Sequence, residues 1–204
     1  MLLFLPDKKE VFGYGDVWTW VALCADTKLI PSYLVANRSG EAARAFIGDV
    51  AGRLRHRVQL STDKHRAYLQ AVEDAFGQEI DYGIISKLYQ EMPGKTAEKR
   101  YSPGACCGVI KGAVCGTPDP KRISTSYVER QNLTIRMGMR RFTRLTNGFS
   151  KKVENHAHAV ALHMLHYNFG RIHKTLRVTP AMEARISDHV WSLEEIADLT
   201  SKIT

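Results

Sequence analysis

Short apolar runs and helically spaced apolar residues alternate along the first ninety positions of the chain. Residues 17–25 and 29–36 are rich in β-branched and aromatic side chains, and Asp26-Thr27 between them favours a turn, so this stretch predicts a β-hairpin. From Ser39, apolar residues recur every third or fourth position up to Leu54, which predicts an amphipathic helix with a serine cap. Three further elements are predicted after it: a strand at 58–63, a helix at about 65–76 and a strand at 80–89.

The second half of the chain begins without a clear pattern. Residues 91–122 are rich in Gly, Pro, Lys and Cys, which predicts a long surface loop. Helical spacing and capping residues then predict four helices: 124 to about 141, 151 to about 167, a short one after Thr179-Pro180, and 192–199. The whole pattern predicts the α/β class, with a mixed sheet flanked by helices and a helical C-terminal part. We expect a main domain over residues 1–178 and a helical extension over 179–204.

The composition and the length of the apolar runs indicate a folded domain without a membrane-spanning helix. Of the 204 residues, 44% are hydrophobic and 25% are charged, which is typical of a folded domain. No apolar run approaches the roughly 20 residues of a membrane-spanning helix. The apolar run that opens the chain is too short for a signal peptide, so we expect no membrane partner and a cytoplasmic protein. The four cysteines lack the spacing of a disulfide framework.

The net charge of +8 is concentrated in one segment. Residues 121–177 hold 12 Lys and Arg against two acids, Glu129 and Glu154, with aromatic residues interleaved. Such a segment attracts a phosphate backbone, because each neutralised phosphate releases condensed counterions. It predicts a nucleic-acid partner; the alternative is a solvated basic helix face.

Two acidic residues are candidates for chemistry. Asp63 comes at the C-terminal end of a predicted strand, where side chains emerge into the crevice at which α/β sheets bind ligands. The alternative is that its carboxylate caps the following helix. Glu129 comes early in the first helix of the basic segment and shares one polar face with Asn132, Arg136 and Arg140. The alternative for Glu129 is an ordinary ion pair that also suits the helix dipole.

A carboxylate among phosphate-binding groups lowers the affinity for DNA unless a cation lies between them. Mg²⁺ is such a cation, since it takes oxygen ligands from one or two carboxylates and from a substrate phosphate. The polar face of this helix is separate from an apolar face formed by Val128, Ile135, Met139 and Phe142. We therefore expect the apolar face to be buried and the polar face to meet DNA and metal.

The basic segment carries a family resemblance. Residues 123–137 are ISTSYVERQNLTIRM, residues 140–152 are RRFTRLTNGFSKK and residues 167–182 are YNFGRIHKTLRVTPAM. These stretches closely resemble bacterial insertion-sequence DDE transposases, most of all the branch named for insertion sequence one, and the likeness runs from about residue 11 to about residue 191. The resemblance implies a ribonuclease-H-like fold, DNA cleavage and strand transfer, and Mg²⁺ or Mn²⁺ as cofactor. It also implies that Asp63 and Glu129 are the second and third acids of a catalytic, metal-binding triad.

The chain departs from the family at the first acid of the triad. Family members carry it in a strand just upstream of the hairpin, as Asp-Glu followed by an aromatic residue, and only sixteen residues precede the hairpin here. Asp7 follows an apolar run but lacks this context, while Asp16 and Asp26 belong to the predicted hairpin and its turn. The chain therefore looks like an amino-terminally truncated transposase, or a second reading frame of one, without the usual DNA-recognition segment.

The mechanism that the resemblance implies is two-metal phosphoryl transfer: one ion activates the water that cuts the transposon end, and the released 3′-hydroxyl attacks target DNA. With two acids instead of three, we expect impaired or absent strand transfer and retained DNA binding. Contacts with DNA are expected from one amide and six basic side chains: Asn132, Arg136, Arg140, Arg141, Arg144, Lys151 and Lys152.

Two functions remain open from the sequence. One is a DDE transposase acting on double-stranded DNA, both transposon ends and target, as a homo-oligomer or with full-length transposase at the nucleoid. The other is a non-enzymatic DNA-binding remnant that occupies transposon ends or inhibits transposition. A strand-transfer assay separates them, because both bind DNA. A plain ribonuclease-H-like nuclease would need three or four clustered acids, which the sequence does not place together.

Overall fold

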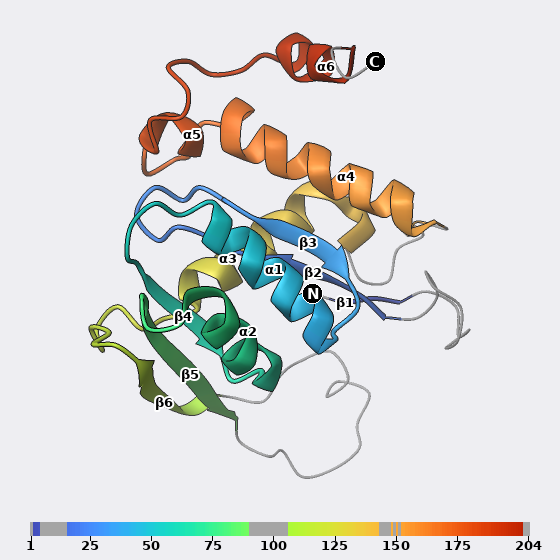
Figure 1. Cartoon of the computed structure of the whole chain (residues 1–204). Coiled ribbons are helices and arrows are strands. Elements are labelled where there is room, and N and C mark those ends of the chain that lie inside the picture. Colours follow the sequence, from blue (N-terminus) through green and yellow to red (C-terminus); the bar gives the residue numbers. More distant parts are fainter. Residues whose placement is uncertain are drawn as a thin grey trace.

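The computed structural model describes residues 2–4, 16–89, 106–142, 148, 150 and 152–201, and its strands form two three-stranded sheets (Figure 1). In the first sheet β1 (Leu2–Phe4), β2 (Asp16–Val21) and β3 (Tyr33–Ala36) are antiparallel. The second sheet is mixed: β4 (Gln59–Asp63) is parallel to β5 (Asp81–Tyr89), and β5 is antiparallel to β6 (Cys106–Cys115). The predicted hairpin is confirmed as β2–β3, and the predicted strand ends at Asp63 as expected.

The prediction of a surface loop over 91–122 is wrong for its middle part, which forms β6. Most side chains of β6 are exposed, and three of its ten residues are Gly or Ala, so the strand lacks the apolar alternation by which strands are recognised. Its ladder with β5 supplies the backbone hydrogen bonds that the side-chain pattern does not indicate. Residues 90–105 lie outside the described residues.

Two helices cover one side of the strands. α1 (Gly40–Gly52) starts after Ser39, whose side chain accepts a hydrogen bond from the Ala42 N–H, as the sequence predicts. α2 (Arg66–Phe76) packs beside it (Figure 1). Their shared core includes Trp20 of β2 and Tyr82 of β5, so residues of both sheets lie under the same helix layer.

The opposite side of β2 and β3 faces α3 (Ser126–Gly138) and α4 (Val153–Leu165). Side chains alternate along β2: Trp20 enters the α1–α2 core, and the neighbouring Val21 packs against the α3–α4 core. Ile135, Met139 and Phe142 are buried in that second core, as predicted, whereas Val128 of the same predicted face is half-buried and is not part of it. The structure is therefore mixed α/β with helices on both sides of the strands.

The chain after α4 turns through a π-helix at His166–Gly170 and continues into α5 (Pro180–Glu183) and α6 (Leu193–Ser201). Thr179 caps α5 by accepting a hydrogen bond from the Met182 N–H. The predicted helical C-terminal part is confirmed, while the domain boundary expected after residue 178 stays a prediction. Across the described ranges no helix has the length and apolar character needed to span a membrane.

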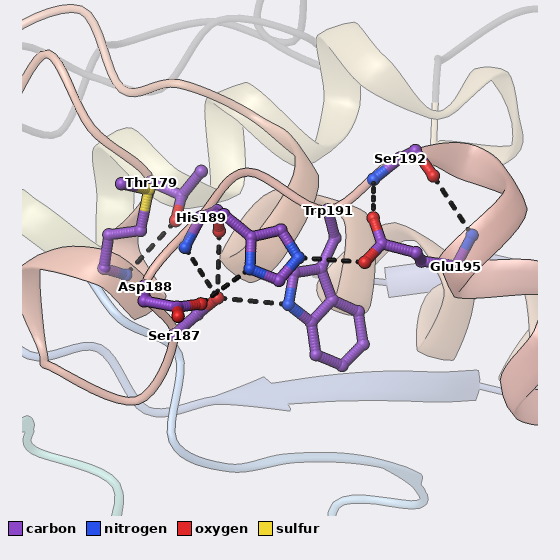
Figure 2. A network of polar contacts seen from close by, with 8 residues as sticks. Thr179, Ser187, Asp188, His189, Trp191, Ser192 and Glu195 are labelled. Carbon is purple, nitrogen blue, oxygen red and sulfur yellow. Dashed lines mark hydrogen bonds and ion pairs between the residues drawn. The ribbon is translucent and has the colours of Figure 1, made fainter.

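A polar network joins α6 to the segment before it (Figure 2). His189 lies between two carboxylates, with Nδ1 2.6 Å from Asp188 and Nε2 2.9 Å from Glu195. Glu195 and Ser192 also form a capping box, since each side chain accepts a hydrogen bond from the backbone N–H of the other. The predicted serine cap of the last helix is thus confirmed.

Candidate metal and nucleic-acid site

Asp63 is the last residue of β4, and its side chain is exposed. Its partner in the parallel ladder is Ile85 of β5. Partners in a parallel ladder point to the same face of the sheet, and side chains alternate along each strand, so Asp63 shares a face with Ile85 and Lys87. We call this face of β4 and β5 the site face.

The site face is the one turned away from α1 and α2. Tyr82, which alternates with the residues of the site face, packs into the α1–α2 core. Residues 119–129 cover the site face instead. The Gln59 side chain exchanges two hydrogen bonds with the backbone of Asp119, at 3.1 and 2.9 Å. Ile123 lies directly over Gly83, where an added Cβ would come within 2.6 Å of the isoleucine side chain.

Glu129 belongs to the first turn of α3, and its carboxylate is held by two donors. Lys87 Nζ lies 2.5 Å from each of its oxygens, and Thr125 donates its hydroxyl to Oε1 at 2.7 Å. Desolvation is the largest single effect and raises the pKa of Glu129, but the hydrogen bonds from Lys87 and Thr125, with the lysine charge, outweigh it and lower that pKa. The hydrogen bond to Glu129 in turn raises the pKa of Lys87. Both groups are therefore charged near neutral pH.

The strand register places Asp63 beside Ile85, two residues before the lysine that holds Glu129. Lys87 follows Ile85 by two residues toward the C-terminal end of β5, and Asp63 is the C-terminal residue of the parallel strand β4. Glu129, held by Lys87, thus lies on the site face toward the C-terminal end of β5. The crevice beyond the C-terminal ends of parallel strands is where α/β sheets bind ligands.

Asp63 does not cap α2 itself, as its alternative role would require. Its side chain stabilises the turn before that helix instead. Its Oδ1 accepts a hydrogen bond from the His65 N–H at 3.2 Å. The N-cap position of α2 is His65 itself, so the aspartate closes the turn that leads into the helix. Among the described residues Oδ2 of Asp63 has no hydrogen-bond donor, so this oxygen stays available to a ligand.

The donors at the site fit Mg²⁺ in kind. Mg²⁺ takes one or two carboxylates and completes its shell with water and substrate phosphate. The Lys87 ammonium already places a positive charge on both oxygens of Glu129, as a bound cation would. Within the described ranges no group of three His, Cys, Asp or Glu side chains could hold a metal ion. Asp7, the candidate for the first acid, lies outside the described residues.

The prediction of one helix from 124 to about 141 is wrong at its C-terminal end. α3 ends at Gly138, Met139 is extended, and Arg140–Phe142 form a separate 3-10 turn. The break allows Met139 and Phe142 to enter the α3–α4 core together. Arg140 therefore leaves the helical line that Glu129 begins, so its predicted place on that face is wrong.

The other predicted DNA contacts differ in their surroundings. Asn132 is half-buried and Arg136 is exposed, both on α3. Arg141 donates to the Asn155 carbonyl at 3.0 Å and to the Ser150 hydroxyl, and so ties the 3-10 turn to the first turn of α4. Lys152 is exposed just before α4. Two further predicted contacts, Arg144 and Lys151, lie outside the described residues.

Two residues at this site, Thr125 and Lys87, were not predicted from the sequence. A signal for Lys87 exists, because a lysine interrupts the apolar run of the strand predicted at 80–89. Its partner could not be predicted, since Glu129 lies 42 positions further along the chain.

A scan against protein-family models and searches of curated proteins and of solved structures each find no match to the chain.

Proposed function

We propose that the chain performs Mg²⁺-dependent DNA cleavage and strand transfer of the DDE transposase type, on a ribonuclease-H-like fold. The observation that carries the proposal is that Asp63 ends β4 and that Glu129 is held by Lys87 of the neighbouring parallel strand β5. The layering of helices on both sides of the strands supports the fold. The resemblance of residues 123–182 to insertion-sequence transposases supports the reaction.

The proposal gives a task to the two acids, to Thr125 and to two arginines. Asp63 and Glu129 would hold a divalent cation together with a substrate phosphate, and that cation would supply charge stabilisation and a more acidic water. Glu129 is ionised for this task by the hydrogen bonds that lower its pKa. Thr125 fixes the orientation of the carboxylate from within its own helix turn. Arg136 and Arg140 contribute positive charge for the DNA backbone, which positions the strand without selecting its sequence.

The test is a nicking assay on labelled duplex DNA with Mg²⁺ or Mn²⁺. Since the described residues contribute two acids, we expect slow, cation-dependent nicking that is lost in Asp63→Asn and in Glu129→Gln. The matched control is Glu154→Gln, which changes the other acid of the basic segment, also in the first turn of a helix, and should leave nicking unchanged. Nicking that survives both site variants contradicts the proposal.

A second candidate function is DNA binding without chemistry, as a transposase remnant or transposition inhibitor. The observation that favours it is the ion pair of Lys87 with Glu129, which neutralises this acid of the basic segment and so removes its repulsion of phosphate. Under this function every variant binds DNA and none nicks it with either cation. The nicking assay therefore separates the two candidates.

A further inference from the structure

The proposed reaction assigns no task to Lys87, although this lysine contacts the Glu129 carboxylate directly. Its ammonium lies 2.5 Å from both oxygens of Glu129, and its side chain is only 26% exposed. Thr125 holds Oε1 of the same carboxylate. The carboxylate is therefore fixed by one donor from β5 and one from the start of α3, and the β5 donor is a cation.

We propose that Lys87 is the positioning residue of Glu129 and competes with the divalent cation for its carboxylate. The lysine orients Glu129 on the site face, and it leaves at least one of the two oxygens when the cation binds. Two cations cannot share the same pair of oxygens without strong repulsion, because Coulomb energy rises as the distance falls. This inference rests on the proposed function, since it takes Glu129 as a metal ligand.

A second lysine on the same sheet provides a matched comparison. Lys111 of β6 is the ladder partner of Ile85, so it also points to the site face. Its Nζ donates to the Pro120 carbonyl at 2.9 Å rather than to Glu129. Replacing either lysine by Met removes one positive charge from the same face, but only Lys87→Met frees the Glu129 carboxylate.

The experiment measures Mn²⁺ binding to the full chain by the electron paramagnetic resonance signal of free Mn²⁺. Lys87→Met should bind Mn²⁺ about two- to fivefold more tightly than the natural chain, the size expected when a partly exposed ion pair no longer competes. Lys111→Met should stay within about twofold of the natural chain, since its charge does not contact the ligand. Lys87→Arg, which keeps the charge and the strand, should bind no more tightly than the natural chain.

The double variant separates competition at Glu129 from a general effect of charge. Glu129→Gln should weaken Mn²⁺ binding. Adding Lys87→Met to this variant should not raise its Mn²⁺ affinity. An equal gain in Lys87→Met and Lys111→Met, or a gain that persists without Glu129, overturns the inference. If Glu129→Gln weakens binding and Lys87→Met changes nothing, the metal site stands and the role of Lys87 is wrong. If Glu129→Gln binds Mn²⁺ as well as the natural chain, both the inference and the proposed metal site are wrong.

Discussion

Asn168 shows how a single side chain connects distant parts of this molecule. Its Oδ1 accepts a hydrogen bond from the Ile30 N–H at 3.0 Å, and its Nδ2 donates to the Ile30 carbonyl at 2.9 Å. The amide thus pairs with the backbone as a neighbouring strand would, 138 positions away in the chain. The adjacent Tyr167 donates its hydroxyl to the Lys28 carbonyl at 3.2 Å. These contacts give the Tyr-Asn pair of the 167–182 motif a structural role.

Replacing Asn168 by Ala should lower the free energy of unfolding by about 2–4 kcal/mol, because two buried backbone groups of Ile30 lose their partners. The measurement is urea denaturation followed by circular dichroism. Asn155→Ala is the matched control, since that side chain is exposed on α4, and it should change stability by less than about 0.5 kcal/mol. A loss in Asn168→Ala no larger than in this control contradicts the structural role.

His156 is a second residue whose environment has a measurable consequence. It is fully buried on α4, with its ring 5.0 Å from that of Phe142. Neither ring nitrogen has a hydrogen-bond partner among the described residues. Burial, and then the charge of Arg141, lowers the pKa of His156, so the folded state holds the ring neutral.

Acid should therefore destabilise the fold through His156. The unfolded chain takes up a proton as the pH falls through about 6.5, while the folded chain does not until a lower pH, so stability is full above that value and declines below it. His156→Leu should flatten the decline of the unfolding free energy between about pH 7 and about pH 5. His158→Leu, on the exposed side of the same helix, should leave the slope unchanged. The idea is wrong if both variants keep the slope of the natural chain.

Much of the residue-level pattern could be predicted from the sequence. The apolar spacing correctly predicts that Ile135, Met139 and Phe142 are buried, and the strand pattern correctly ends at Asp63. Spacing along one element carries no information about contacts between elements. The pair of Lys87 with Glu129 and the pairing of Asn168 with Ile30 depend on strand register and on packing across layers.

The elements that were mispredicted share a physical cause. β6 forms although its side chains are mostly exposed, since the backbone of β5 provides its hydrogen bonds. α3 stops at Gly138 because the chain that follows gains burial of Met139 and Phe142 by leaving the helix. In both places tertiary contacts override the local pattern. Elements with a strong apolar face of their own, such as α1, agree with the prediction.

An exposed network of charged side chains joins α6 to the segment before it (Figure 2). His189 contacts Asp188 and Glu195, and Glu195 belongs to the capping box that starts the helix. The hydrogen bond to Asp188, followed by that to Glu195, raises the pKa of His189. Apolar contacts add to this attachment, since Ile196 is buried and Trp191 packs on Phe169 with ring centroids 4.5 Å apart.

A rise in pH should loosen α6. Because the folded pKa of His189 lies above its unfolded value, the stabilisation is fully present below about pH 6.5 and is lost as the pH rises through the raised folded value. Hydrogen exchange of residues 193–201, corrected for the intrinsic effect of pH, should show falling protection between about pH 6 and about pH 9. His189→Gln should remove this dependence, and His158→Gln on α4 should keep it. Protection that falls equally in His189→Gln would mean that another group controls α6.

At the scale of the whole molecule, the basic segment 121–177 adjoins the site face of β4 and β5. Residues 121–177, with 12 basic and two acidic side chains, supply α3 and α4, while α1 and α2 cover the other side of the strands. The segment 119–129 that covers the site face leads directly into α3. A DNA backbone following the basic segment would thus approach the ends of β4 and β5.

The proposed DNA binding predicts how affinity responds to mutation and to salt. Arg136→Ala with Arg140→Ala should weaken binding to every duplex by roughly tenfold, and should reduce the slope of log K against log salt concentration by about two, one for each lost phosphate contact. Arg44→Ala with Arg55→Ala removes the same charge from exposed positions in and just after α1, and should change the slope far less. Fluorescence anisotropy on duplexes of unrelated sequence, titrated over a range of salt, measures both quantities. A loss confined to one duplex would show that these arginines select sequence, and an equal loss in both pairs would show that only total charge matters and that no surface of the fold is specialised for DNA.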